Sequence, residues 1–496
     1  MSSAVLHTAH RIHAPNSRGA VASCPPSPQL YDIHTSFEAS CILVWVLTPF
    51  GRDSVAGDGH GDDFGAVRGR TAKKGGLFLH ARLVANGGKG VSVSQLGGDR
   101  AGEMQITRFL HNPKVTVSEM VTTASARTCA QARGRHVLAI QDTTALRVDE
   151  KGVGLSFHPL IAIDANDGAL LGLVDVCFLM RKGGERATRK QRDFEEKDSV
   201  RWLRGAESAS ALAEAGAACV TVIEDREGDI YESFAFKPAN VEKLVRAAQD
   251  RRLADGTSVF AKADEWTEAG CMTVDLPAAP GRKARQATLS LRYGTVEIKR
   301  PKNRKPGRRK LPETVTVRLV DAREIDPPKT EEPAHWRLLT THQVNDIADA
   351  RRIIGFYRQR WTIEQLFRTM KTKGFNVEAL RQEQGGPLER LVTAVLIAAI
   401  TVMQLVAERE GKAKRPLADA FDPDDRPALE RVCQSLEGKT DKQKNPHPKG
   451  SLAYAAWVFA RLGGWTGYYG KPGPIIMLRG LTEFHAIKHG WDLRNV

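Results

Sequence analysis

The segment from Tyr357 to Lys371 combines residues that could act on a negatively charged polymer. If it forms one helix, turning about 100° per residue, its polar side chains fall within an arc of roughly 80°. Such a helix is about 21 Å long and could lie along several phosphates of a nucleic acid. Its polar face would carry a phenol, three cations and one carboxylate: Tyr357, Arg360, Glu364, Arg368 and Lys371.

The ordinary alternative is a solvated helix face. Glu364 would then pair with Arg360 and Arg368 four residues away, which stabilises a helix by only a few tenths of a kcal/mol. The choice between a solvated face and a chemical site depends on whether the chain brings further acids close to Glu364.

Two further acids lie next to apolar runs that are typical of strands. Asp142 falls inside the run Val137–Arg147, although Asp is depleted in strands. Asp225 follows the run 218–223, at the end of a strand where sites in α/β sheets usually lie. Taken singly, each has a simpler explanation: a turn residue for Asp142 and a helix N-cap for Asp225.

Composition narrows the class of partner. The chain has 496 residues, and its 73 Lys and Arg against 58 Asp and Glu give a net charge of +15. A polyanion, first of all nucleic acid, is therefore the expected partner. The seven cysteines are scattered and form no Cys-x-x-Cys pair, which argues against a disulfide framework or a zinc ribbon. We expect reduced thiols in a cytoplasmic protein.

The pattern of elements predicts several domains. Residues 1–62 are expected to be poorly ordered or to follow a start placed too far upstream, and residues 63–126 form short basic helices that suit DNA docking or an ordinary solvated cap. Three strands in hairpin order lie between 137 and 180, before a helix and the strand 218–223. The apolar run 391–406 contains Thr and Gln and is too short for a membrane span, so it predicts a buried helix.

Residues 237–345 are expected to form a β-rich insertion. Between Arg282 and Lys310 there are twelve Lys and Arg and a single acid, Glu297. This density favours a hairpin that follows phosphates over a merely solvated loop.

Read together, the three acids resemble those of the DDE cut-and-paste transposases of bacterial insertion sequences. The subgroup marked by Tyr-x2-Arg-x3-Glu-x6-Lys is matched at Tyr357, Arg360, Glu364 and Lys371. The family's Asp-Thr-Thr strand is matched at 142–144, its Asp-Arg-Glu-x-Asp-Ile segment at 225–230, and its Trp-x-Leu-Leu-Thr-Thr strand at 336–341. The resemblance covers about residues 75–496.

The resemblance implies a fold and a reaction. The fold is α/β, with a ribonuclease-H-like mixed sheet in a catalytic domain over 127–375, the β insertion, an N-terminal helical DNA-binding unit, and a helical C-terminal domain over 376–496 that dimerises. The reaction is metal-dependent cleavage and transfer of DNA strands, on transposon ends and target DNA, by a homodimer in a synaptic complex. Asp142, Asp225 and Glu364 would hold Mg²⁺, or Mn²⁺ in its place. Carboxylates are the ligands that such hard cations prefer, and three of them can hold two ions about 3.5 to 4 Å apart.

The resemblance also implies roles for other residues. Tyr357, Arg360, Arg368 and Lys371 would bind phosphates near the transposon end, with Arg246 as a further phosphate contact. Trp336 would stack against a displaced base. Two other functions stay open: a DNA-binding protein that occupies transposon ends without catalysis, and a nuclease that cuts without joining.

Overall fold

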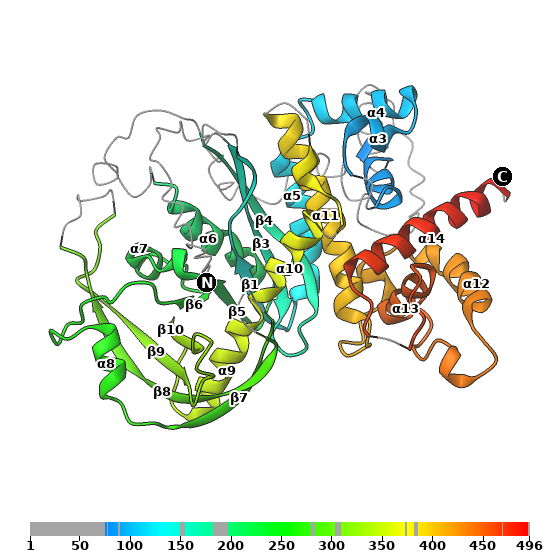
Figure 1. The fold of residues 1–496 in the computed structure, drawn as a ribbon. Coiled ribbons are helices and arrows are strands. Elements are labelled where there is room, and N and C mark those ends of the chain that lie inside the picture. Colours follow the sequence, from blue (N-terminus) through cyan, green and yellow to red (C-terminus); the bar gives the residue numbers. More distant parts are fainter. Residues whose placement is uncertain are drawn as a thin grey trace, which may run out of the picture.

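The computed structural model describes residues 75–76, 78–87, 90–148, 154–181, 197–278, 283–302, 309–372, 374–380, 385–468 and 470–494. The prediction for residues 1–62 lies outside these ranges. The described part is mixed α/β, which confirms the predicted class, with one ten-stranded sheet flanked by helices (Figure 1).

The sheet has two halves, of which the first carries two of the acids. Its strands are β1 (His136–Gln141), β2 (Thr144–Val148), β3 (Gly154–Asp164), β4 (Leu170–Arg181), β5 (Cys219–Glu224) and β6 (Glu242–Arg246). β3 pairs antiparallel with β4 and with β1, while β1, β5 and β6 run parallel. This order is consistent with a ribonuclease-H-like domain.

The expected strand Val137–Arg147 is divided into β1 and β2 at Asp142 and Thr143. Both parts pair with β3 in one continuous register, since Gln141 lies opposite Leu160 and Thr144 opposite Phe157. That register sets Asp142 against Pro159, which has no N–H to donate to a ladder. The interruption therefore falls where the sheet offers fewer backbone hydrogen bonds, and it leaves the Asp142 carboxylate at a strand end.

The second half continues the same sheet. β10 (His335–Thr340) pairs antiparallel with β6, and β9 (Thr314–Glu324), β8 (Arg285–Lys299) and β7 (Gly270–Leu276) follow as an antiparallel meander. Most of the expected insertion is thus an extension of the central sheet. Its basic stretch includes β8 and the turn after it, of which residues 303–308 lie outside the described ranges.

Side chains alternate between the two faces of the first half, as the period of two of a strand requires. Helix α6 (Val200–Glu214) covers one face. The other face packs with α9 (Ile347–Arg358), α10 (Trp361–Met370) and α11 (Gly386–Glu408). The first face is formed by Val137, Ala139, Val220 and Val222, and the second by Leu138, Ile140, Ile223 and Leu244.

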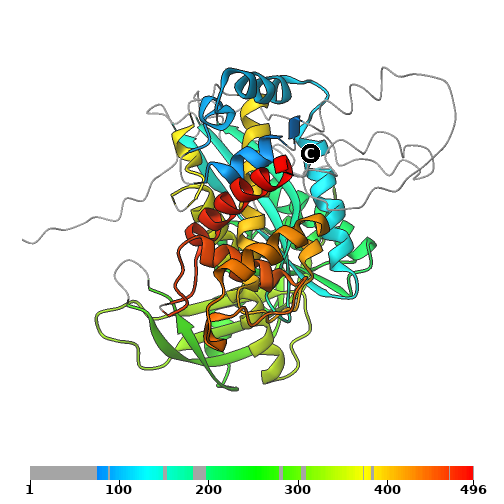
Figure 2. The same ribbon diagram turned by 90° about the vertical axis from the view of Figure 1, so that its right-hand side faces the viewer.

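The remaining helices surround α11, which lies between the sheet and the C-terminal helices (Figure 1). They are α3 (Val93–Gly97), α4 (Arg100–His111), α5 (Val117–Ala132), α12 (Arg426–Leu436), α13 (Leu452–Leu462) and α14 (Pro474–Arg494), while the short α7 (Tyr231–Ala235) and α8 (Val259–Glu265) accompany the sheet. Figure 2 shows α14, in red, beside the N-terminal helices, in blue. Thr482 of α14 donates a hydrogen bond to the carbonyl of Val84, at 2.8 Å.

Helix α11 is longer than the apolar run predicted, and it packs inside the protein. By length and composition alone its 23 residues could cross a membrane, but 94% of its most apolar window is buried inside the protein. It packs on β4 and α5 as well as on α13 and α14. The apolar residues 391–406 are therefore mostly buried by contacts within the protomer. The expected domain boundary at 126–127 falls inside α5.

Candidate active site

The sheet delivers two of the acids to one edge. Asp142 directly follows β1 and Asp225 directly follows β5, and because these strands are parallel neighbours, their carboxyl ends lie side by side. Each carboxylate is held by a nearby backbone N–H: Asp142 accepts from Thr143 at 2.7 Å, and Asp225 accepts from Glu227 at 2.8 Å. Asp225 thus also caps a short 3₁₀ turn, so its simpler reading as a cap is correct without excluding a role in chemistry.

The third acid, Glu364, is in the first turn of α10, and here the predicted geometry was wrong. Tyr357 and Lys371 do not share one helix, because α9 ends at Arg358 and α10 begins at Trp361. Across the break the N–H of Arg360 bonds to the carbonyl of Tyr357, a 3₁₀ pattern that tightens the turn. Lys371 lies just beyond the end of α10. The predicted polar face is therefore divided between two helices.

Arg360, located in this break, joins two of the acids. Its guanidinium donates to Asp142 Oδ2 at 2.9 Å and to Glu364 Oε1. The pairing of Glu364 with Arg360 that the solvated-face reading predicted is present, but the same cation also reaches across to the sheet. The three side chains are only 16% to 28% exposed, so the group is a partly desolvated cluster rather than a surface ion pair.

The charges of the cluster act on one another. Burial and, next in size, the negative charge of Asp225 raise the pKa of Asp142 to about 6, although Arg360 opposes both effects. Glu364 also raises the pKa of Asp142. Asp142 is repelled by both other carboxylates, and one guanidinium bridges it to Glu364, so the site favours added positive charge. All the donors are carboxylate oxygens, which fit Mg²⁺ or Mn²⁺.

Four of the expected DNA-contacting residues gather beside the acids. Arg246, at the end of β6, interacts electrostatically with Tyr357 and Arg360 and donates to the carbonyl of His335 at 3.0 Å. Trp336 of β10 lies 6.4 Å from Tyr357 between ring centroids. Tyr357 itself is only 8% exposed. Its hydroxyl interacts with both Arg246 and Arg360.

The other two expected contacts lie farther along the chain. The exposed Arg368 packs over the ring of Trp361, 4.8 Å from its centroid, one turn beyond Glu364. Lys371 forms an ion pair with Glu378 at 3.1 Å. Arg368 is separated from Tyr357 by the break between α9 and α10, and Lys371 lies beyond the end of α10.

A known family matches this part of the chain. Residues 229–401 match the family model described as the transposase DDE domain. The match supports a DDE transposase. It spans about a third of the chain, from just after Asp225 to the middle of α11, and includes Glu364. The pairing of β5 with β1 and β6 connects the matched region to the two earlier acids.

Beneath the acids lies a buried polar network that the sequence alone did not reveal. Gln141 precedes Asp142, Glu224 precedes Asp225, and Gln141 Nε2 donates to Glu224 Oε1 at 2.8 Å. Lys243 of β6 donates to the other oxygen of Glu224. Gln141, Glu224 and Lys243 are each at most 1% exposed. The available signal was a polar residue directly before each acid in an otherwise apolar strand.

The network continues on the other side of Gln141. His158 Nε2 donates to Gln141 Oε1 and accepts at Nδ1 from the hydroxyl of Thr143, both at 2.8 Å. Burial lowers the pKa of His158 well below its usual value, so the ring is neutral. Arg201 Nε in turn donates to Thr143 Oγ1 at 2.9 Å. The series of hydrogen bonds therefore runs from Arg201 through Thr143, His158 and Gln141 to Glu224. It joins the ends of β1 and β5. It also adds Arg201 as a cation near the acids.

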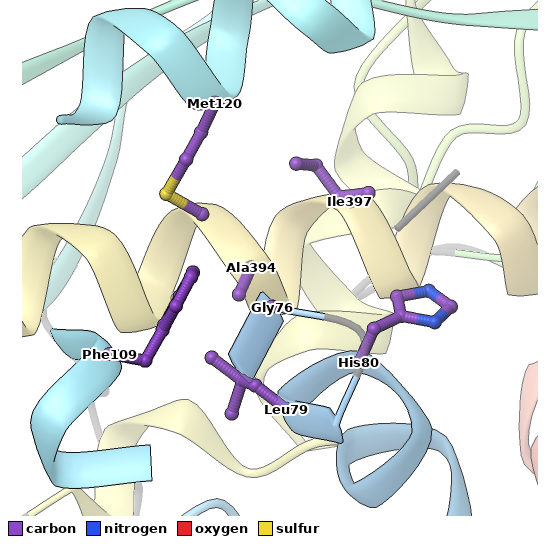
Figure 3. Close-up of a pocket in the computed structure, with 7 residues that line it drawn as sticks. All are labelled: Gly76, Leu79, His80, Phe109, Met120, Ala394 and Ile397. Carbon is purple, nitrogen blue, oxygen red and sulfur yellow. The ribbon is translucent and has the colours of Figure 1, made fainter. Parts of the chain in front are cut away.

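A separate small pocket lies away from the acids, between α4, α5, α11 and the N-terminal helical segment that carries Gly76, Leu79 and His80 (Figure 3). None of these helices carries one of the three acids. The pocket is almost wholly apolar, which suits packing rather than catalysis. Its lining residues are Gly76, Leu79, His80, Phe109, Met120, Ala394 and Ile397.

The raised pKa of Asp142 predicts a stability effect. The pKa of Asp142 is about 6 in the folded state, against the ordinary value of 3.8 in the unfolded state. Such an acid begins to destabilise the native state as pH rises above 3.8, and the full cost is reached above about pH 6. We expect Asp142→Asn to raise the free energy of unfolding at pH 7.5 by at most about 3 kcal/mol. The gain should disappear below about pH 4. Urea denaturation of both proteins across pH 4 to 8 measures it, and a loss of stability at pH 7.5 would contradict the electrostatic account.

Proposed function

We propose that the protein is a cut-and-paste DNA transposase of the Tyr-Arg-Glu-Lys subgroup, encoded by a bacterial insertion sequence. It would cleave DNA at transposon ends and join the freed ends to target DNA, in the cytoplasm. The observation that carries the proposal is the cluster of Asp142, Asp225 and Glu364 around one guanidinium, at the edge of a sheet consistent with a ribonuclease-H-like domain.

The three acids would hold divalent ions, Mg²⁺ or Mn²⁺. Bound there, two ions would supply charge for both the attacking and the leaving oxygen of a phosphoryl displacement. The carboxylates would no longer need Arg360 to neutralise them, and its guanidinium would be available to a DNA phosphate. In this view Arg360 holds Asp142 and Glu364 together in the free protein and helps to position the scissile phosphate in the complex.

The neighbouring residues would orient the DNA. Arg246 and Tyr357 border the acids and would bind phosphates together with Arg360, while Trp336 would stack on a base lifted out of the duplex. Arg368 and Lys371 would contact the backbone farther along the same strand. The net charge of +15 supports a long electrostatic contact with the duplex.

A homodimer that pairs two ends would complete the reaction. Because the apolar face of α11 is buried within the protomer, this contact would use other parts of the C-terminal region. Three large apolar residues of that region are exposed by 38% to 70%: Tyr468, Ile475 and Ile487. A dimer contact at these residues is part of the proposal.

The alternative of an end-binding protein without catalysis is supported less well. Such a protein needs the cations but not a set of partly buried acids that repel one another and repel phosphate. A cleavage and strand-transfer assay on an end-containing duplex, with Mg²⁺ and with excess EDTA, tests the proposal. We expect both steps to require the metal. Binding without any metal-dependent cleavage would favour the alternative, and cleavage without joining would favour a nuclease.

DNA affinity should depend on Arg246. We expect Arg246→Ala to weaken binding and to lower the slope of log affinity against log salt by about 0.9, the value for one lost phosphate contact on duplex DNA. The matched control is Lys449→Ala, because Lys449 pairs with Glu430 in the C-terminal region, far along the chain from the acids. Titrations over a salt series measure both slopes. An unchanged slope for Arg246→Ala would exclude it as a phosphate contact.

A further inference from the structure

A second group of metal-ligating side chains lies at the other end of the strands that carry the acids. His136 is the first residue of β1 and Cys219 the first residue of β5, and the two are register partners. His342 follows the end of β10. One ligand atom from each of the three side chains lies within 4.8 Å of the others. The hydroxyl of Thr221 lies between the imidazoles, 2.8 Å from His136 Nε2 and 2.7 Å from His342 Nε2.

This group is distinct from the three acids. His136 and Asp142 are six residues apart on the same strand line, which corresponds to about 20 Å. Both belong to the face of the sheet that packs with α9, where the ring of Phe356 contacts His136 edge-on at 4.8 Å between centroids. One face of the sheet thus presents carboxylates at one end and nitrogen and sulfur donors at the other.

The donor set selects a different class of ion from Mg²⁺. Two imidazoles and a thiolate suit Zn²⁺ and related transition metals, which bind nitrogen at about 2.0 to 2.1 Å and sulfur at about 2.3 Å. In tetrahedral geometry such ligand atoms are roughly 3.3 to 3.8 Å apart. Side-chain shifts of about 1 Å would close the present arrangement to that spacing. The two imidazoles already converge on one point, at the Thr221 hydroxyl.

Charges of both signs act on the group, and Asp164 and Lys237 contribute besides the two that act on more than one of its residues. Glu242 of β6 is the register partner of Thr221, and its charge acts on both Cys219 and His342. Arg352 of α9 acts on the same two residues and on His136, and it is paired with Asp349 at 2.8 Å. Glu242, whose carboxylate also accepts a hydrogen bond from the Thr341 hydroxyl, or a water molecule would supply the fourth ligand.

We propose that His136, Cys219 and His342 bind one zinc ion that has a structural role. The ion would join the starts of β1 and β5 to the segment between β10 and α9. That segment leads into the helices that carry Tyr357 and Glu364, so the ion would fix the starting point of α9. The proposal is independent of the proposed function, because it concerns different residues and a different metal.

Cobalt titration of the full-length protein tests this site. After removal of metals, Co²⁺ added to one equivalent should give the near-ultraviolet charge-transfer absorption of a thiolate ligand, together with the visible bands of a tetrahedral ion. Ions at the three acids have only oxygen ligands and give no thiolate absorption. Added Zn²⁺ should displace the cobalt and remove the signal.

Matched variants assign the signal. Cys219→Ser should abolish the thiolate band, whereas Cys271→Ser, which alters another half-buried free cysteine, should keep it. Glu364→Gln should keep it as well. His342→Gln should weaken zinc binding by at least about tenfold. Circular dichroism checks that each variant is folded. A wild-type protein without a thiolate band, or a band that survives Cys219→Ser, would overturn the proposal.

Discussion

Replacing Glu364 with Gln is expected to abolish DNA cleavage, with a loss of at least about 10³-fold, or about 4 kcal/mol of transition-state stabilisation. On the proposed function, the carboxylate would supply charge to the metal ions, and the neutral amide of the same shape would not. The amide oxygen still accepts a hydrogen bond from Arg360, so the turn between α9 and α10 should stay folded. Single-turnover cleavage of an end-containing duplex with Mg²⁺ measures the loss.

DNA binding by the same variant should move in the opposite direction. Without metal, Glu364 repels phosphates, so Glu364→Gln should bind DNA in EDTA as tightly as the wild type or more tightly. The control is Glu378→Gln, which removes a carboxylate that pairs with Lys371 at the far side of α10 and is 45% exposed. It should cleave at nearly the normal rate. Near-normal turnover by Glu364→Gln would eliminate α10 as the source of the third catalytic acid.

Replacing Lys243 with Met is expected to give the largest loss of stability, about 3 to 5 kcal/mol. Lys243 and Glu224 form an ion pair in which both side chains are at most 1% exposed. Without the ammonium, the Glu224 carboxylate would remain buried with only the amide of Gln141 as a donor. Breaking such a pair from one side costs more than removing both charges.

The loss should depend on pH in a defined direction. Burial already raises the pKa of Glu224 to about 7, and loss of Lys243 should raise it further. An acid whose folded pKa is raised destabilises the native state more as pH rises above its unfolded value. The deficit of Lys243→Met, measured by urea denaturation, should therefore be larger at pH 8 than at pH 5.

Two variants complete this experiment. Lys243→Met with Glu224→Gln leaves no buried charge and should recover much of the lost stability. Lys262→Met removes a lysine whose ion pairs, with Asp255 and Glu265, are at the surface, and should change stability by less than about 1 kcal/mol. If the double variant were no more stable than Lys243→Met, the cost would arise from packing rather than from the unpaired charge.

The sequence by itself determined the parts of this protein that depend on neighbouring residues. Apolar runs before Asp142 and Asp225 predicted the strands that present them, and the long apolar run 391–406 predicted a buried helix. The basic composition indicated a polyanionic partner. The spacing from Tyr357 to Lys371 indicated the kind of chemistry, and the family match over 229–401 supports that reading. Apart from the partner, which composition indicated, each inference used a periodicity or a motif within a few turns of chain.

Only the tertiary structure decided the features that join distant segments. The ion pair between Arg360 and Asp142 spans 218 positions, and the bond between Gln141 and Glu224 spans 83. Helical periodicity assumed a continuous helix through 357–371 and so placed Tyr357 and Lys371 on one face. In the fold, tight hydrogen bonds at Gln359 and Arg360 interrupt that helix and direct Arg360 toward the sheet. Contacts of this kind depend on how strands and helices pack, which no local pattern in the chain specifies.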